Sequence, residues 1–179
     1  MSAVFVLLAS AVMTHVLGHM CALSPYQRGG IVPDEDLNNV GQAQCGNANV
    51  NSTGAPNGIA PCYGQSRDDE RITNFIGRGA YQPMVVYKNE QHYNADNPGN
   101  FTWNLYEFNT ATDEYKFITT LGSKRDTDNG DLTNFQIEPE IPFGLNGEHY
   151  VVQSIYYTNQ KIYANTTTFF VQCSDVLLI

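Results

Sequence analysis

From Ala80 onward the sequence is a series of short segments rich in Val, Tyr, Phe, Ile and Thr, and polar turn clusters separate them. These residue types favour strands, and no helical period interrupts the series. Within one segment Phe101, Trp103 and Leu105 recur at every second position, the period of a strand with one buried face. The pattern predicts strands over 81–89, 99–108, 114–121, 133–141, 148–158 and 166–179, and it indicates an all-β fold, an antiparallel β-sandwich.

The region from Ser24 to Gly79 has a different character. Gly, Pro, Asn and Asp recur every few residues, and no period lasts long enough to define an element beyond a weak helical turn around 67–75. Because Cys45 and Cys62 lie inside this region, we expect disulfides to tether long N-terminal loops to the sandwich. No internal repeat or low-complexity linker divides the chain, so a single domain is expected.

The first 18 residues contain no Asp, Glu, Lys or Arg and include an apolar run from Ala3 to Val12. This composition is typical of a secretory signal peptide, and the run is too short to span a bilayer. We expect cleavage after Gly18, which gives a signal peptide at 1–18 and a mature domain at 19–179. Cleavage after Ala11 is the alternative, because Ala9-Ser10-Ala11 also has the small residues of a cleavage site.

Two further features agree with a secreted, extracellular protein without an integral membrane segment. The four cysteines form an even set, which predicts two disulfides whose pairing stays open among Cys21, Cys45, Cys62 and Cys173. Three sequons predict a glycoprotein, with acceptors at Asn51, Asn100 and Asn165.

The net charge of −9 belongs wholly to the mature chain, because the signal segment carries no charged side chain. Such an acidic surface argues against nucleic acid and against anionic membranes as partners. It is compatible with a neutral glycan or a metal cation.

A histidine directly follows the expected cleavage site. If His19 is the first residue, its α-amine and its imidazole Nδ1 can chelate one metal ion in a six-membered ring. One more imidazole gives a T-shaped set of three nitrogens, which favours Cu(II). That imidazole comes from His92 or His149, and we favour His92, because it lies in a polar loop between two expected strands.

Three segments match a known family in chain order: "HMCALSPYQRGG", "NEQHYNADNPGNFTW" and "FFVQCSDV". They resemble the lytic polysaccharide monooxygenase-like proteins, in particular their copper-acquisition-factor branch, over His19 to Asp175. The resemblance implies an immunoglobulin-like β-sandwich and a Cu2+ ion held by a histidine brace of His19 and His92. It also implies an aspartate ligand, for which Asp175 is the first candidate and Asp131 the second. Phe170 is a candidate for the axial aromatic residue of the monooxygenases or for a core residue.

Three functions follow as hypotheses. The favoured one is a secreted Cu(II)-binding protein for copper acquisition or handling, which is not an enzyme; a carboxylate ligand would favour holding Cu(II). Its expected partners are the copper ion and either an extracellular glycan or a membrane copper transporter. The alternatives are a copper-dependent polysaccharide monooxygenase and a metal-free extracellular domain with a glycan-binding or structural role.

Overall fold

The computed structural model describes residues 20–28, 49–51, 61–62, 74–88, 91–128, 133–160 and 168–179. Within these ranges the chain forms strands and no helix. The strands are β1 (Met20–Ser24), β2 (Asn49–Asn51), β3 (Asn74–Ile76), β4 (Met84–Lys88), β5 (Asn100–Asn109), β6 (Glu114–Arg125), β7 (Thr133–Ile137), β8 (His149–Tyr157) and β9 (Thr168–Leu178).

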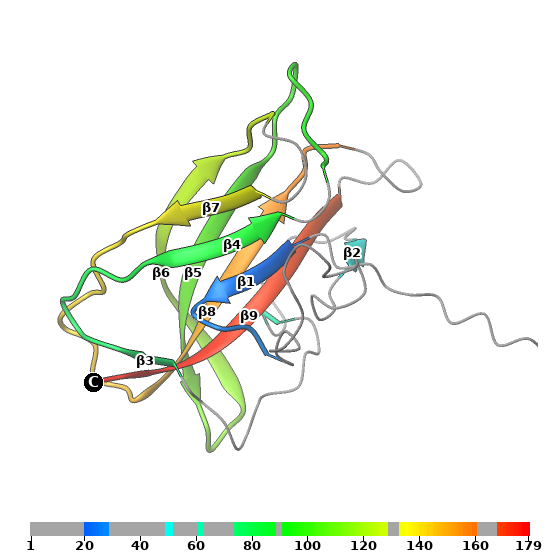
Figure 1. The fold of residues 1–179 in the computed structure, drawn as a ribbon. Helices are drawn as coiled ribbons and strands as arrows, with labels where there is room; N and C mark the ends of the chain where they lie inside the picture. Colours follow the sequence, from blue (N-terminus) through cyan, green and yellow to red (C-terminus); the bar gives the residue numbers. More distant parts are fainter. Residues whose placement is uncertain are drawn as a thin grey trace, which may run out of the picture.

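The strands form two sheets, and the small one lies across the large one (Figure 1). The small sheet has the order β1-β4-β7, and the large sheet has the order β2-β9-β8-β5-β6, with β3 also pairing β9. The named pairings are antiparallel except that of β3 with β9, which is parallel. The prediction of an all-β, immunoglobulin-like sandwich is therefore confirmed.

All six predicted strands are present, as β4 to β9. The strands β1, β2 and β3 were not predicted. Two of them have only three residues, too few to show a period, and exist through their pairing with β9. The helical turn expected around 67–75 is wrong at its end, where Asn74 and Phe75 belong to β3; the rest of that segment lies outside the described residues.

The core forms between the facing sides of the two sheets. Phe101, Trp103 and Leu105 of β5 are all buried, as their alternation predicts. The Phe101 ring stacks on Phe135 of β7 at a centroid distance of 4.1 Å and on Tyr156 of β8 at 4.3 Å. Burial of several large rings in one layer is the main source of favourable free energy for a sandwich of this kind.

The other side of the large sheet holds part of the N-terminal region. Cys62 forms a disulfide with Cys173 of β9, and the Gln153 side-chain amide donates a hydrogen bond to the Pro61 carbonyl at 2.5 Å. Cys21 is also disulfide-bonded. The predicted disulfide tether is thus confirmed at Cys62. The expected signal peptide lies outside the described residues, and no helix in the described part of the chain is long and apolar enough to cross a membrane.

The Cys62–Cys173 disulfide closes a loop of sequence separation 111, so we expect it to contribute strongly to stability. Replacing both cysteines by serine should lower the free energy of unfolding by about 2–5 kcal/mol. Urea unfolding followed by tryptophan fluorescence measures the change. An unaltered midpoint in the double variant would show that the loop is held by other contacts.

Candidate metal centre

His92 lies in the loop between β4 and β5, packed against the end of β9. Its ring is half-buried and stacks on Phe170 with centroids 5.5 Å apart and planes 13° apart. The Tyr156 ring of β8 lies 6.2 Å away at a tilt. Phe170 is itself buried and belongs to the main core, so a rigid aromatic surface supports one face of the imidazole.

The backbone of His92 is held at its carbonyl, which accepts a hydrogen bond from the Gln160 side-chain amide. Its N–H lies near the phenol oxygen of Tyr156 and by itself lowers the pKa of that phenol. The Tyr156 hydroxyl in turn donates to Asp126 Oδ2 at 2.6 Å. Burial, followed by the hydrogen bond and charge of Asp126, raises the pKa of Tyr156 far above its ordinary value, so the phenol keeps its proton.

Asp126 is paired with a fully buried lysine. Lys88 Nζ donates to Asp126 Oδ1 at 2.9 Å, to the Thr127 carbonyl at 3.2 Å and to Gln91 Oε1. The three protons of the ammonium group therefore all have acceptors, as a buried charge requires. Since Gln91 directly precedes His92, the ion pair is linked to the loop both through Gln91 and through Tyr156.

Strand β1 begins at the same end of the sandwich. Met20 pairs with Lys88 of β4, and its carbonyl accepts a hydrogen bond from the Gln172 side-chain amide at 3.0 Å. Gln172 lies two residues from Phe170, so the two side chains project from the same face of β9. His19, the residue before Met20, lies outside the described residues.

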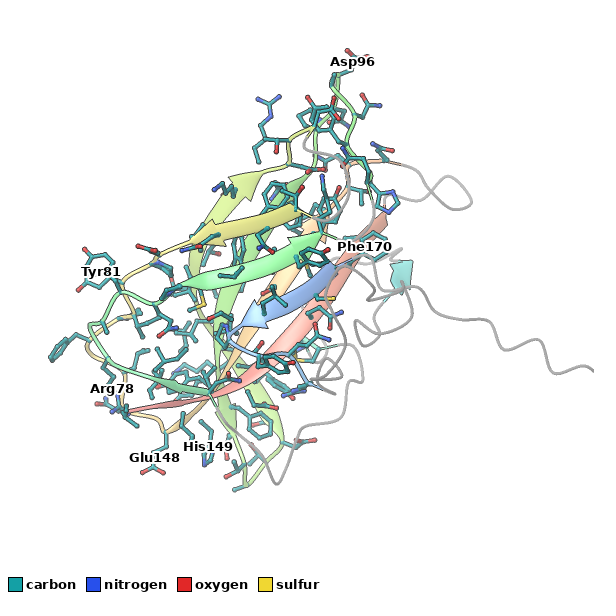
Figure 2. The ribbon with its side chains drawn as sticks, in the orientation of Figure 1. Arg78, Tyr81, Asp96, Glu148, His149 and Phe170 are labelled. Carbon is teal, nitrogen blue, oxygen red and sulfur yellow. A yellow bond between two sulfur atoms is a disulfide. The ribbon has the colours of Figure 1, made fainter. Side chains whose placement is uncertain are left out.

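The other candidate imidazole lies elsewhere. His149 begins β8 and pairs with Leu177, whereas Tyr157 at the far end of β8 pairs with Phe169. Figure 2 shows His149 and Phe170 near opposite ends of the sandwich. His149 is therefore far from the start of β1.

Asp175, the first candidate for an aspartate ligand, is not brought together with His92. It lies five residues along β9 from Phe170, about 17 Å away at strand spacing, and an odd separation puts it on the opposite face. Its carboxylate accepts hydrogen bonds from Arg28 Nε at 2.9 Å and Nη2 at 2.7 Å. Asp131, the second candidate, lies outside the described residues.

The Arg28–Asp175 ion pair has a structural role instead. Both side chains are buried, and the Arg28 N–H also donates to the Cys173 carbonyl at 2.7 Å. Burial by itself lowers the pKa of Arg28, but Asp175, with Tyr115 adding to it, raises it above its ordinary value. The pair fastens the segment after β1 to β9, on the face away from His92.

Lys88, Asp126 and Tyr156 were not predicted from the sequence. A usable indication was present, because Lys88 follows Met84 and Val86 at every second position and so belongs to the inward side of an apolar strand. A lysine in that position predicts a buried acidic partner. Within the described ranges, no three His, Cys, Asp or Glu side chains gather as a metal site. A site at His92 therefore requires a ligand from the residues not described.

No family model matches the sequence, and no curated protein matches it. Among solved structures, a cellulose-active polysaccharide monooxygenase from M. thermophila overlaps with a TM-score of 0.43 and 13% identity, covering 66% of this chain and 57% of that one. A glycoside hydrolase family 61 member from Hypocrea jecorina overlaps with a TM-score of 0.40 and 10% identity, covering 60% of this chain and 52% of that one. A lytic polysaccharide monooxygenase from Cellvibrio japonicus overlaps with a TM-score of 0.36 and 15% identity, covering 57% of this chain and 53% of that one. The chain thus spans little more than half the length of these structures, and its own strand pairings define its fold.

We expect Asp175→Asn to destabilise the protein without disturbing His92. Replacing the carboxylate by an amide removes the negative charge that neutralises the buried Arg28, which costs about 3 kcal/mol in the free energy of unfolding. Urea unfolding measures this loss, and the imidazole NMR resonances of His92 in metal-free protein should not move. Glu107→Gln is the control, because it removes the exposed pair with Lys116 and should cost less than about 1 kcal/mol. A shift of the His92 resonances in Asp175→Asn alone would contradict the separation of the two sites.

Proposed function

We propose that this chain is a secreted Cu(II)-binding protein, used in copper acquisition or handling, whose mature form begins at His19. The ion is held by the α-amine and imidazole of His19 and by the imidazole of His92. The observation that carries the proposal is the fixed position of His92 at the end of the sandwich where β1 begins.

The described residues fit such a site. An imidazole that stacks on Phe170, on a backbone held at its carbonyl, has little freedom to lose when it binds a metal. β1 starts at Met20, so the proposed amino-terminal residue, His19, directly precedes the strand. The α-amine has a pKa near 8, and proton competition at neutral pH is therefore small.

Metal holding is proposed over polysaccharide oxidation because the sequence motifs resemble the copper-acquisition branch. When bound, Cu(II) would be the cargo of the protein. Aspartate as a further ligand stays part of the proposal, with Asp131 as the candidate, because Asp175 is engaged by Arg28. Asp126 is not proposed as a ligand, because its carboxylate already accepts hydrogen bonds from Lys88, Tyr156 and the Thr127 N–H.

The test begins with the protein secreted from a eukaryotic host, and mass spectrometry should find His19 at its amino terminus. Titration with Cu(II) against a competing chelator should then give a Kd at least about a hundredfold lower for wild type than for His92→Ala, since one of three nitrogen ligands is lost. His149→Ala is the matched control and should bind as wild type does. Equal affinity of wild type and His92→Ala would contradict the proposal.

A second variant separates the amine from the side chains. One alanine added in front of His19 keeps every side chain but breaks the six-membered chelate of the α-amine with the imidazole, so the nitrogen ligands and the Cu(II) EPR spectrum should change. Incubating the copper-loaded protein with a reductant and cellulose or chitin should release no oxidised oligosaccharide. Release of such products, absent from His92→Ala, would replace the binding role by the monooxygenase alternative.

A further inference from the structure

The buried ion pair of Lys88 and Asp126 lies behind His92, and neither residue belongs to the proposed ligand set. Both side chains have no exposed surface. A buried pair of this kind is costly to desolvate, and replacement by apolar residues is often neutral or stabilising. Stability alone therefore does not account for it, and its further contacts show what else the pair holds in place.

The pair contacts the His92 loop at two points. Asp126 Oδ2 accepts a hydrogen bond from the Tyr156 hydroxyl at 2.6 Å. This bond fixes the position of the hydroxyl proton, and so the direction of the lone pairs on the phenol oxygen. The His92 N–H lies near the same phenol oxygen, and the centroid of the Tyr156 ring lies 6.2 Å from that of the imidazole. Through Lys88 Nζ the pair holds Gln91 Oε1, one residue before His92, and Gln91 Nε2 reaches Asp128 Oδ1 at 3.2 Å.

These contacts form one continuous chain from the small sheet to the loop. Lys88 comes from β4, Asp126 follows β6 and Tyr156 comes from β8, so three separate strands fix its members. The Asp126 N–H also donates to the Gly99 carbonyl at 2.9 Å, at the other end of the loop that carries His92. The network thus holds the loop at Gln91, at His92 and at Gly99.

We propose that Lys88, Asp126 and Tyr156 are positioning residues that set the place of His92 for metal binding, with the Tyr156 hydroxyl as the direct contact. This inference rests on the proposed function for its metal arm, but the positioning itself is a property of the metal-free protein. The Tyr156 hydroxyl acts through the His92 backbone and leaves the imidazole to the ion. Partners behind a metal ligand typically change metal affinity by 10- to 100-fold when removed.

Tyr156→Phe tests this sharply, because it removes one oxygen and keeps the ring that stacks on Phe101. Tyr150→Phe is the matched control. Tyr150 lies on the same strand, is also buried, and its hydroxyl accepts a hydrogen bond from the Gly147 N–H at 3.0 Å, near the opposite end of the sandwich. Each variant therefore removes one buried phenol oxygen that lies near a loop N–H.

The first measurement is amide hydrogen exchange by NMR on the mature, metal-free protein. The exchange rate of the His92 amide should rise about tenfold in Tyr156→Phe and stay at the wild-type value in Tyr150→Phe. The rates are compared at urea concentrations that give the three proteins the same free energy of unfolding. Unchanged His92 exchange in Tyr156→Phe would overturn the inference, whatever copper does. Lys88→Met, which leaves Asp126 buried without its cationic partner, should raise the same exchange rate.

The second measurement is the Cu(II) affinity and the continuous-wave EPR spectrum of the same variants. Tyr156→Phe should raise the Kd about tenfold or more and alter the copper hyperfine splitting, and Tyr150→Phe should do neither. Wild-type affinity no better than that of a short peptide beginning with histidine would refute the proposed function and leave the exchange result to decide the positioning. Tight wild-type binding with an unchanged Tyr156→Phe would refute the role of the network in metal binding.

Discussion

The interaction on which the site end of this sandwich depends is the ion pair between Lys88 and Asp126, buried where the two sheets meet. Its charges have no access to water, so they must be satisfied by neighbouring groups, and those groups are the ones that shape the His92 loop. The second buried pair, Arg28 with Asp175, does comparable work on the other face of β9 for the segment after β1. Two buried ion pairs thus hold two loops in place: the loop that carries His92 and the segment that follows β1.

A division of labour follows from this arrangement. The aromatic core of Phe101, Phe135 and Tyr156 supplies the apolar burial that stabilises the sheets. At one edge of that core, the Tyr156 hydroxyl donates to Asp126 and the Tyr156 ring lies beside His92. One side chain therefore belongs to both the core and the proposed site. Rigidity of the core is thereby passed to a loop residue, which is how a loop can hold a ligand in a defined place.

How much could be predicted differs between fold and site. The six strands after Ala80 followed from their content of Val, Tyr, Phe, Ile and Thr. In β5 a period of two added to this, because residues such as Trp103 face the core wherever the partner strands lie. β2 and β3 could not be found this way, because pairing with β9 alone defines them. For the proposed site, His92 was predicted from its loop. Asp175 was assigned from a motif, and only the alternation of β9 and the position of Arg28 show that it faces away from His92. Lys88, Asp126 and Tyr156 are far apart in sequence, so their contact exists only in the folded chain.

His92 and an amino-terminal histidine are proposed to bind the same ion. Pulsed EPR of the Cu(II)-loaded protein with natural 14N in its histidines measures this directly, because the remote ring nitrogens of coordinated imidazoles modulate the electron spin echo. Two imidazoles should contribute to the modulation in wild type and one in His92→Ala. Modulation from a single imidazole in wild type, unchanged by His92→Ala, would show that His92 is not a ligand.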